Sequence, residues 1–323
     1  MQDVGIFGTR LVRIITVPAT SISAPQEAES TLRRDESPEM SGRRIVHDRI
    51  SAAAVQMSSG SDPASNVESA LELIRRAARQ GATYIQLPEY FNYLGPVENY
   101  EMVAESIPGP TTKRFGALAK EHGVTVQLGS VLEISSTPGK FFNTSVILGH
   151  SGHVTATYRK AHLFDIDVPG EVAFKESTAI TAGDELVVAA CPGFDLGVSV
   201  CFDLRFPEMY RALCMKGATI LAIPAAFNAN TGRAHWEVLV RARAIENHVF
   251  VVAAAQVGTT VEGIATFGHS MIVGPWGDVL AESASDGEDV LVATLDLDEV
   301  DRRRSQIDVV HLRRPDLYSS LDD

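Results

Sequence analysis

The sequence is poor in cysteine, in metal-binding motifs and in long apolar runs. Its three cysteines, Cys191, Cys201 and Cys214, form no CxxC pair and no Cys/His group at zinc-ligand spacing. The nine histidines contain no HExxH motif. No apolar run approaches the ~20 residues needed to span a bilayer. These absences argue against a disulfide scaffold, a metal site and a transmembrane protein.

Positive charge is also scarce. The chain has 28 basic and 41 acidic residues, a net charge of −13, which argues against nucleic acid or an anionic membrane as partner. Its 323 residues, 45% of them hydrophobic, suffice for a sizeable core. We therefore expect a globular enzyme, and a cytoplasmic one, because a reducing compartment suits a free working thiol.

Cys201 is the most informative residue. Residues 196–208 read LGVSVCFDLRFPE, in which an apolar strand-like run stops at the cysteine and a turn then opens a helical stretch over residues 206–216. A thiol beside a helix start meets N–H groups and a positive dipole end, which favour the thiolate. Position alone does not separate such a nucleophile from a buried, inert cysteine.

Two other segments favour a nucleophile. Residues 83–91 read TYIQLPEYF and deliver Glu89 at a strand end, and residues 158–165 read YRKAHLFD and end a strand-like run near Lys160. A carboxylate that takes the thiol proton and an ammonium that stabilises an oxyanion complete the chemistry of acyl transfer. Each of these residues, taken alone, is more often solvated surface.

At these three segments the sequence resembles the carbon–nitrogen hydrolase, or nitrilase, superfamily, whose members use a Glu-Lys-Cys triad. The resemblance covers about residues 49–318 and implies Glu89 as general base, Lys160 as oxyanion stabiliser and Cys201 as nucleophile. It also implies that Glu176, in FKES at 174–177, is the second glutamate that orients groups in the site.

The residues after the cysteine distinguish branches of this superfamily. True nitrilases typically follow the cysteine with Trp-Glu, whereas this chain has Phe202-Asp203 and resembles the Nit and omega-amidase branch. The resemblance implies hydrolysis of a small amide through a thioester. In this mechanism the Phe202 N–H and Lys160 hold the oxyanion, ammonia leaves, and no cofactor is needed.

Four alternatives remain. Hydrolysis of an N-carbamoyl or ureido acid uses the same triad, and a nitrilase is less favoured by the residues after the cysteine. A non-catalytic or ammonia-donating module is disfavoured by the intact triad and by the end of the chain at Asp323. A redox-sensing Cys201 is disfavoured because no CxxC partner exists.

Substrate-binding residues are predicted from proximity. In carbamoyl-acid hydrolases of the superfamily, the arginine that matches Arg205 grips the substrate carboxylate, a task that suits a guanidinium. A simpler interpretation is an i, i+3 pair with Glu208. Phe91 and Tyr93 follow Glu89 and are candidates for the pocket lining, although the aromatics near it, Tyr90 included, are more often core residues. His162 and His269 are expected to hold loops by hydrogen bonds.

The chain divides into a disordered extension at 1–48, rich in proline, serine and charge, and one catalytic domain at 49–323. From residue 49, strands and helices alternate, with hairpins that do not fit a purely parallel sheet. The resemblance implies a four-layer α-β-β-α sandwich of two mixed sheets, whose subunits associate through a helical face into a homodimer or larger oligomer.

Overall fold

The computed structural model describes residues 49–168 and 172–318. The predicted disordered extension at 1–48 lies outside the described residues. The extent of the catalytic domain, 49–323, stays a prediction for the same reason, because residues 319–323 are not described.

Six strands form the first sheet, which is mixed. Its inner strands β1, β2 and β3 are parallel, and the others pair antiparallel. The spatial order is β16 (Asp289–Asp296), β1 (Arg49–Gln56), β2 (Tyr84–Gln86), β3 (Thr125–Ile134), β4 (Phe141–Leu148) and β5 (Val154–Arg159).

The second sheet repeats this plan. Its strands β9, β10 and β11 are parallel and its flanks antiparallel. The spatial order is β15 (Val279–Glu282), β14 (Met271–Val273), β11 (Phe250–Ala253), β10 (Ile220–Ala222), β9 (Phe194–Val198) and β8 (Val188–Cys191). Two small hairpins pair β6 (Asp165–Val168) with β7 (Val172–Lys175) and β12 (Val257–Thr259) with β13 (Ala265–Phe267).

Strand β1 shows why the two sheets stack. Its side chains alternate between faces: Ala52 and Ala54 enter the core shared with the second sheet, whereas Ala53 and Val55 enter the core beneath the helices. Gln86, buried at the sheet interface, accepts a 2.7 Å hydrogen bond from the Ala254 N–H of the other half. The alternation places one sheet face against the other and leaves the outer face for helices.

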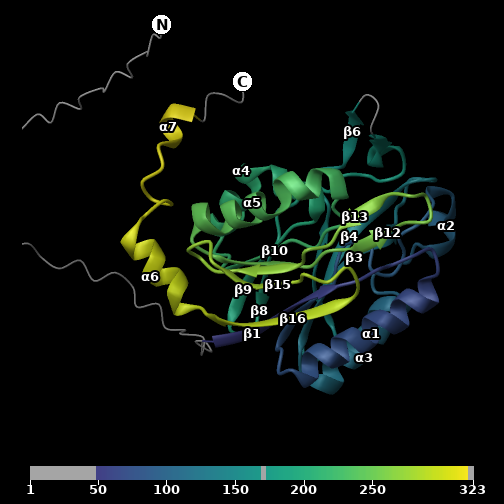
Figure 1. The fold of residues 1–323 in the computed structure, drawn as a ribbon, viewed down its shortest axis with the longest axis horizontal. Coiled ribbons are helices and arrows are strands. Elements are labelled where there is room, and N and C mark those ends of the chain that lie inside the picture. The colour runs from purple at the N-terminus through teal and green to yellow at the C-terminus, as the bar shows by residue number, and fades with distance from the viewer. Residues whose placement is uncertain (1–48, 169–171, 319–323) are drawn as a thin grey trace, which may run out of the picture. The chain divides into compact units, whose positions relative to one another are not determined.

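Helices cover both outer faces, so the predicted four-layer sandwich is confirmed (Figure 1). On the first sheet lie α1 (Pro63–Arg79) and α3 (Pro110–His122), and on the second lie α4 (Pro207–Met215) and α5 (Ala229–Asn247). Helix α1 begins as its sequence predicts, because Asp62 accepts a hydrogen bond from the Ala64 N–H and Pro63 occupies the first turn.

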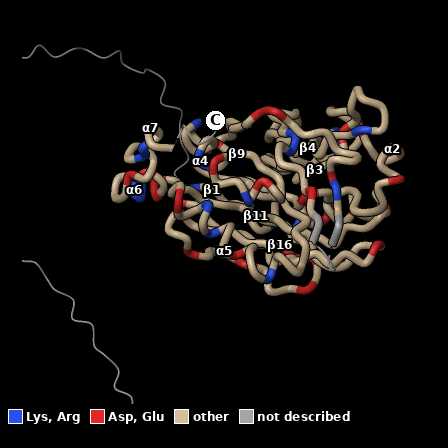
Figure 2. The backbone as a smooth tube through the Cα atoms, turned by 90° about the horizontal axis from the view of Figure 1, so that it is seen from above, with Lys and Arg blue, Asp and Glu red and all other residues tan. Residues whose placement is uncertain are grey.

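Three further α-helices are described: α2 (Tyr100–Val103), α6 (Asp298–Gln306) and α7 (Pro315–Tyr318). Short 3₁₀ helices span Val97–Asn99, Glu176–Thr178 and Cys201–Arg205. Helix α6 has acidic residues in its first turn and basic residues in its last, an order that complements the helix dipole (Figure 2). Within the described ranges, no helix is both long enough and apolar enough to cross a membrane.

Candidate active site

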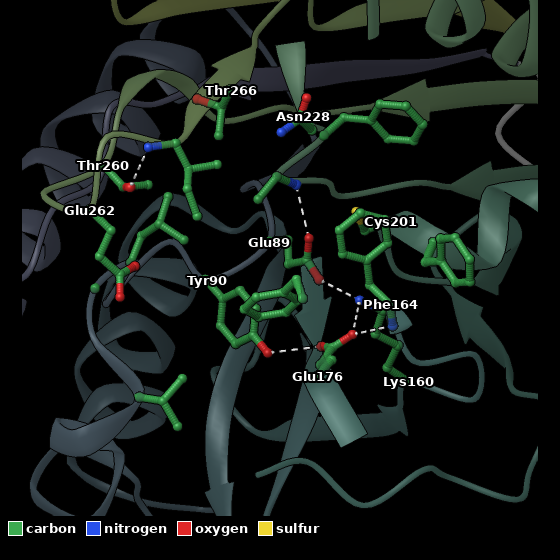
Figure 3. Close-up of a pocket in the computed structure, with 18 of the residues that line it drawn as sticks. Glu89, Tyr90, Lys160, Phe164, Glu176, Cys201, Asn228, Thr260, Glu262 and Thr266 are labelled. Atoms are coloured by element: carbon green, nitrogen blue, oxygen red, sulfur yellow. Dashed lines mark hydrogen bonds and ion pairs between the residues drawn. The ribbon is translucent and has the colours of Figure 1, made fainter. Parts of the chain in front are cut away.

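Cys201 lies just past the C-terminal end of β9, in a single 3₁₀ turn that runs from Cys201 to Arg205. Its backbone φ is +48°, a left-handed value that residues other than glycine rarely adopt. The turn is held because the Cys201 N–H donates a 2.8 Å hydrogen bond to the Pro224 carbonyl. Strained backbone of this kind clusters at functional sites, and here it places Cys201 on the wall of a cavity (Figure 3).

The expectation of a helix-stabilised thiolate is wrong. Helix α4 begins only at Pro207, six residues along the chain, so its N-terminus does not start at the cysteine. Burial and the neighbouring Glu89 carboxylate raise the pKa of Cys201 well above its ordinary value, and Lys160 opposes them only in part. The Cys201 side chain is therefore a neutral thiol at neutral pH.

Lys160 follows the edge strand β5 and is 2% exposed. Its Nζ donates one 2.9 Å hydrogen bond to Glu89 Oε1 and another to Glu176 Oε2. Burial acts to lower the pKa of Lys160, but the two carboxylates outweigh it and raise that pKa. The ammonium is therefore charged at neutral pH and held between two carboxylates.

Glu89 comes from the turn after β2, which lies in the first sheet, and both of its oxygens have partners. Oε1 also accepts a 2.9 Å hydrogen bond from Asn143 Nδ2, and Oε2 accepts one of 2.9 Å from the Ala226 N–H. The side chain of Gln256 anchors the backbone by donating to the Glu89 carbonyl at 3.0 Å. The carboxylate that touches the thiol is thus fixed from both halves of the sandwich.

Glu176 follows β7 and accepts four hydrogen bonds. Oε1 accepts from the Tyr90 hydroxyl at 3.0 Å, and Oε2 accepts from Lys160 at 2.9 Å and from the Phe164 N–H at 2.7 Å (Figure 3). Oε1 also accepts from Asn143 Nδ2 at 3.1 Å. Burial acts to raise the pKa of Glu176, but Lys160 and the other donors outweigh it and lower that pKa. This carboxylate is therefore ionised and bonded to the lysine, and its role in orienting groups of the site stays a prediction.

Sequence reasoning missed Asn143 and assigned Tyr90 to the core. Asn143 is fully buried in β4, and its Nδ2 donates to both Glu89 and Glu176. An asparagine inside an otherwise strand-like run was the available signal, because such a residue is uncommon in strands unless it has partners. Tyr90 has a φ of +53° and lines the cavity rather than only packing in the core.

The cavity has a volume of about 130 Å³. Since one water needs roughly 10–15 Å³ on this scale, the cavity holds a ligand of about ten heavy atoms. Its polar end carries the triad, and its walls are aromatic and aliphatic. The residues beyond the triad that line it include Tyr90, Leu94, Val97, Tyr100, Phe164, Phe174, Glu176, Phe202, Phe227, Asn228, Glu262 and Ile264.

Phe91 and Tyr93 do not line this cavity. Phe91 is fully buried beneath α1 and α3, edge-on to Phe115 with ring centroids 5.1 Å apart. The Tyr93 hydroxyl donates to the Pro96 carbonyl at 2.9 Å. The left-handed turn at Tyr90 accounts for both, because it redirects the chain immediately after Glu89.

Arg205 lies beside the cavity rather than in its lining. Its guanidinium carbon is 5.8 Å from the Phe202 ring centroid and 5.2 Å from that of Phe227, and both rings line the cavity. Its Nη1 lies 3.4 Å from His235 Nδ1. Among the described residues no ion pair joins Arg205 to a carboxylate, so the pair with Glu208 is not formed. Burial lowers the pKa of Arg205.

Of the two histidines, His162 contacts Asp203, and His269 lies 3.1 Å from Glu282 through Nδ1. In the part of the chain that the structure describes, no group of three His, Cys, Asp or Glu side chains is arranged to hold a metal ion. The Phe202 N–H belongs to the same turn as Cys201, and its role toward an oxyanion stays a prediction.

Known proteins share this sequence and fold. A sequence model of the carbon–nitrogen hydrolase family matches residues 51–305. The omega-amidase NIT2 of Xenopus tropicalis is 42% identical over 254 residues, which cover 79% of this chain and 91% of the relative. The crystal structure of the Caenorhabditis elegans NitFhit protein superposes with a TM-score of 0.77 and 36% identity, over 85% of this chain and 67% of that chain.

A third comparison concerns the cysteine. A mutant of the amidase from Nesterenkonia sp. AN1, in which one glutamate is replaced by glutamine, shows the acetamide moiety of fluoroacetamide covalently added at its active-site cysteine. That chain superposes with a TM-score of 0.71 and 25% identity, over 84% of this chain and 96% of that chain. The family match, the relatives and the buried Glu-Lys-Cys site agree: this chain belongs to the carbon–nitrogen hydrolase (nitrilase) superfamily, in its Nit/omega-amidase-like branch.

Proposed function

We propose that this protein hydrolyses the terminal amide of a small carboxylic acid through a thioester on Cys201. The observation that carries the proposal is the contact between a neutral thiol and the Glu89 carboxylate on the wall of a small cavity, with Lys160 bonded to the same carboxylate. The 42% sequence identity to an omega-amidase supports an amide as the substrate.

The geometry supports a defined sequence of proton transfers. Because the resting thiol is neutral, Glu89 takes its proton as sulfur attacks the amide carbon. Lys160 and the Phe202 N–H stabilise the oxyanion. The protonated Glu89 then gives its proton to the leaving nitrogen, and ammonia departs. Glu89 next takes a proton from a water that attacks the thioester, which releases the acid and regenerates the thiol.

Arg205 supports a carboxylate on the substrate. It is a partly buried cation without a carboxylate partner among the described residues, and it stacks beside the two rings that border Cys201. A guanidinium in such a place is available for a bidentate bond to a carboxylate. We assign it to the acid group of the substrate, at the edge of the cavity.

Ammonia release from a panel of omega-amides, ureido acids and a nitrile tests the proposal. We expect turnover of an omega-amide without carbon dioxide; carbon dioxide with ammonia would mean ureido-acid hydrolysis instead. A Cys201→Ala variant should lose turnover and still unfold cooperatively. Cys214→Ala is the matched control, because Cys214 is also buried, burial raises its pKa to about 12, and it lies outside the cavity.

Mass spectrometry adds a direct readout. An acyl adduct on Cys201 during turnover, absent from Cys201→Ala and present in Cys214→Ala, is the expected result. Near wild-type turnover by Cys201→Ala would end the thioester mechanism.

We propose also that the chain forms homo-oligomers in a reducing, cytoplasmic compartment. Helix α5 exposes Val238 and Ile245, two turns apart on one side, and Trp276 is 48% exposed in the turn after β14. Apolar side chains gathered on one surface are typical of association sites.

A further inference from the structure

The carboxylate of Asp203 is fully buried and binds two segments of the chain. Oδ2 accepts a 2.7 Å hydrogen bond from the Tyr158 hydroxyl and one of 2.8 Å from the Val200 N–H. Oδ1 accepts the His162 N–H at 3.0 Å and lies 2.7 Å from His162 Nδ1. All four contacts are within ordinary hydrogen-bond distance.

The residues that bind Asp203 lie close to Lys160 and Cys201 in the sequence. Tyr158 and His162 stand two residues before and two after Lys160, and Val200 immediately precedes Cys201. One carboxylate therefore ties the backbone around the proposed oxyanion stabiliser to the backbone around the proposed nucleophile.

Among the strands that the structure describes, no ladder makes this connection. Lys160 follows β5, the edge strand of the first sheet, whereas Cys201 follows β9 in the second sheet. Ladder hydrogen bonds join strands within a sheet, so they do not set the distance from the ammonium to the sulfur. The bond from the Lys160 N–H to the Asn143 carbonyl, at 2.9 Å, ties the lysine to its own sheet only.

Two further contacts stiffen the link. The Tyr158 oxygen accepts a 3.0 Å hydrogen bond from the N–H of Ala161, the residue after the lysine. Burial and Asp203 raise the pKa of Tyr158, which keeps its hydroxyl protonated and donating. The His162 ring stacks on Phe206, with centroids 3.7 Å apart.

We propose that Asp203 is a positioning residue: it sets the geometry between Lys160 and the Cys201 sulfur, and so acts on the acylation step. The inference rests on the proposed function, since it assigns those two residues their roles. Asp203 itself does not line the cavity.

The test is Asp203→Asn, which keeps the shape but replaces one acceptor oxygen with an NH₂ donor. In the Oδ2 place that donor faces the Tyr158 hydroxyl and the Val200 N–H, and in the Oδ1 place it faces the His162 N–H. We expect kcat to fall roughly 10- to 100-fold, the scale of an ångström-level misplacement, with KM changed less than about 3-fold. The pH profile of Cys201 alkylation by iodoacetamide should move to higher pH, because Lys160 is the nearby charge that lowers the thiol pKa.

Glu105→Gln is the matched control. Glu105 also accepts two hydrogen bonds, from the Thr111 N–H at 2.8 Å and the Thr111 hydroxyl at 2.6 Å, but it lies outside the cavity near the start of α3. The Glu105→Gln substitution should lower Tm and leave kcat and the alkylation profile unchanged.

The proposal is wrong if Asp203→Asn has a lower Tm but the wild-type kcat and alkylation profile, since the carboxylate would then only stabilise the fold. If Asp203→Asn does not fold, Tyr158→Phe removes one donor and should move both readouts in the same direction by less. Wild-type values in Tyr158→Phe would then overturn the proposal. Failure of the proposed function is distinguishable, because alkylation of Cys201 does not depend on the substrate.

Discussion

Replacing Glu176 with glutamine tests whether its charge holds the site together. Four donors converge on this carboxylate, two on each oxygen. A glutamine keeps one acceptor oxygen and replaces the other with an NH₂ group. Whichever way the amide turns, two donors face a nitrogen that cannot accept: either Tyr90 and Asn143, or Lys160 and the Phe164 N–H.

The magnitude follows from those two lost acceptors. A buried donor without an acceptor costs about 1–3 kcal/mol, so two cost about 2–6 kcal/mol of unfolding free energy. At roughly 2–4 °C per kcal/mol for a protein of this size range, Tm should fall by several degrees or more. We expect kcat to fall as well, because Lys160 loses one of its two carboxylate partners and its ammonium is then positioned by Glu89 alone among the two.

The loss should depend on pH with a definite sign. The folded-state pKa of Glu176 is lowered from its ordinary value of 4.5, so its ionisation stabilises the fold above about pH 4.5. That contribution is lost as pH falls through the folded-state pKa. The difference in unfolding free energy between wild type and Glu176→Gln is therefore largest near pH 7 and shrinks below pH 4.5.

Urea unfolding at pH 7, 5 and 3.5, with kcat at pH 7, measures both effects. Glu262→Gln is the control, because Glu262 is an exposed carboxylate at the same cavity. A stability difference that stays constant from pH 7 to 3.5, or a Tm equal to wild type, would refute the assigned role of the Glu176 charge.

The remaining predictions concern the substrate and the surface. Arg205→Lys should raise KM for an omega-amide acid roughly 10- to 100-fold, through loss of a charged bidentate bond of about 1.5–3 kcal/mol, and leave KM for its methyl ester unchanged. Equal loss on both would make Arg205 structural. Glu262→Gln should lower KM for the same acid by about 1.5- to 5-fold in low-salt buffer, the range of an exposed charge pair, and steady-state kinetics at two salt concentrations checks it. Val238→Glu should reduce the mass measured by light scattering if α5 forms the subunit contact, and an unchanged mass would place that contact elsewhere.

The sequence predicted the fold class, and it predicted that four charged or nucleophilic residues lie in one site. Period-two and helical patterns, with cap residues such as Asp62, are local properties, so they are readable without a structure. The segments around Glu89, Lys160, Glu176 and Cys201 are distinctive, and the structure places all four together.

What the patterns did not reach depends on packing between distant segments. The protonation of Cys201 is decided by burial and by Glu89, more than 100 residues away along the chain, and not by the local dipole argument. Phe91 and Tyr93 follow Glu89 closely, yet a left-handed residue at Tyr90 turns both away from the cavity. Proximity in sequence does not specify direction in space.

The sequence by itself indicated alternating strands and helices and, through its resemblance to a known family, the four layers and the segments that carry Glu89, Lys160 and Cys201, because periods and motifs are encoded over short stretches. Only the tertiary structure decided three features: the protonation state of the Cys201 thiol, the hydrogen bonds from Asn143 to the Glu89 and Glu176 carboxylates, and the hydrogen bonds that join Asp203 to Tyr158 and Val200. These depend on solvent exclusion and on hydrogen bonds between segments far apart in the sequence, which form only when the chain has folded.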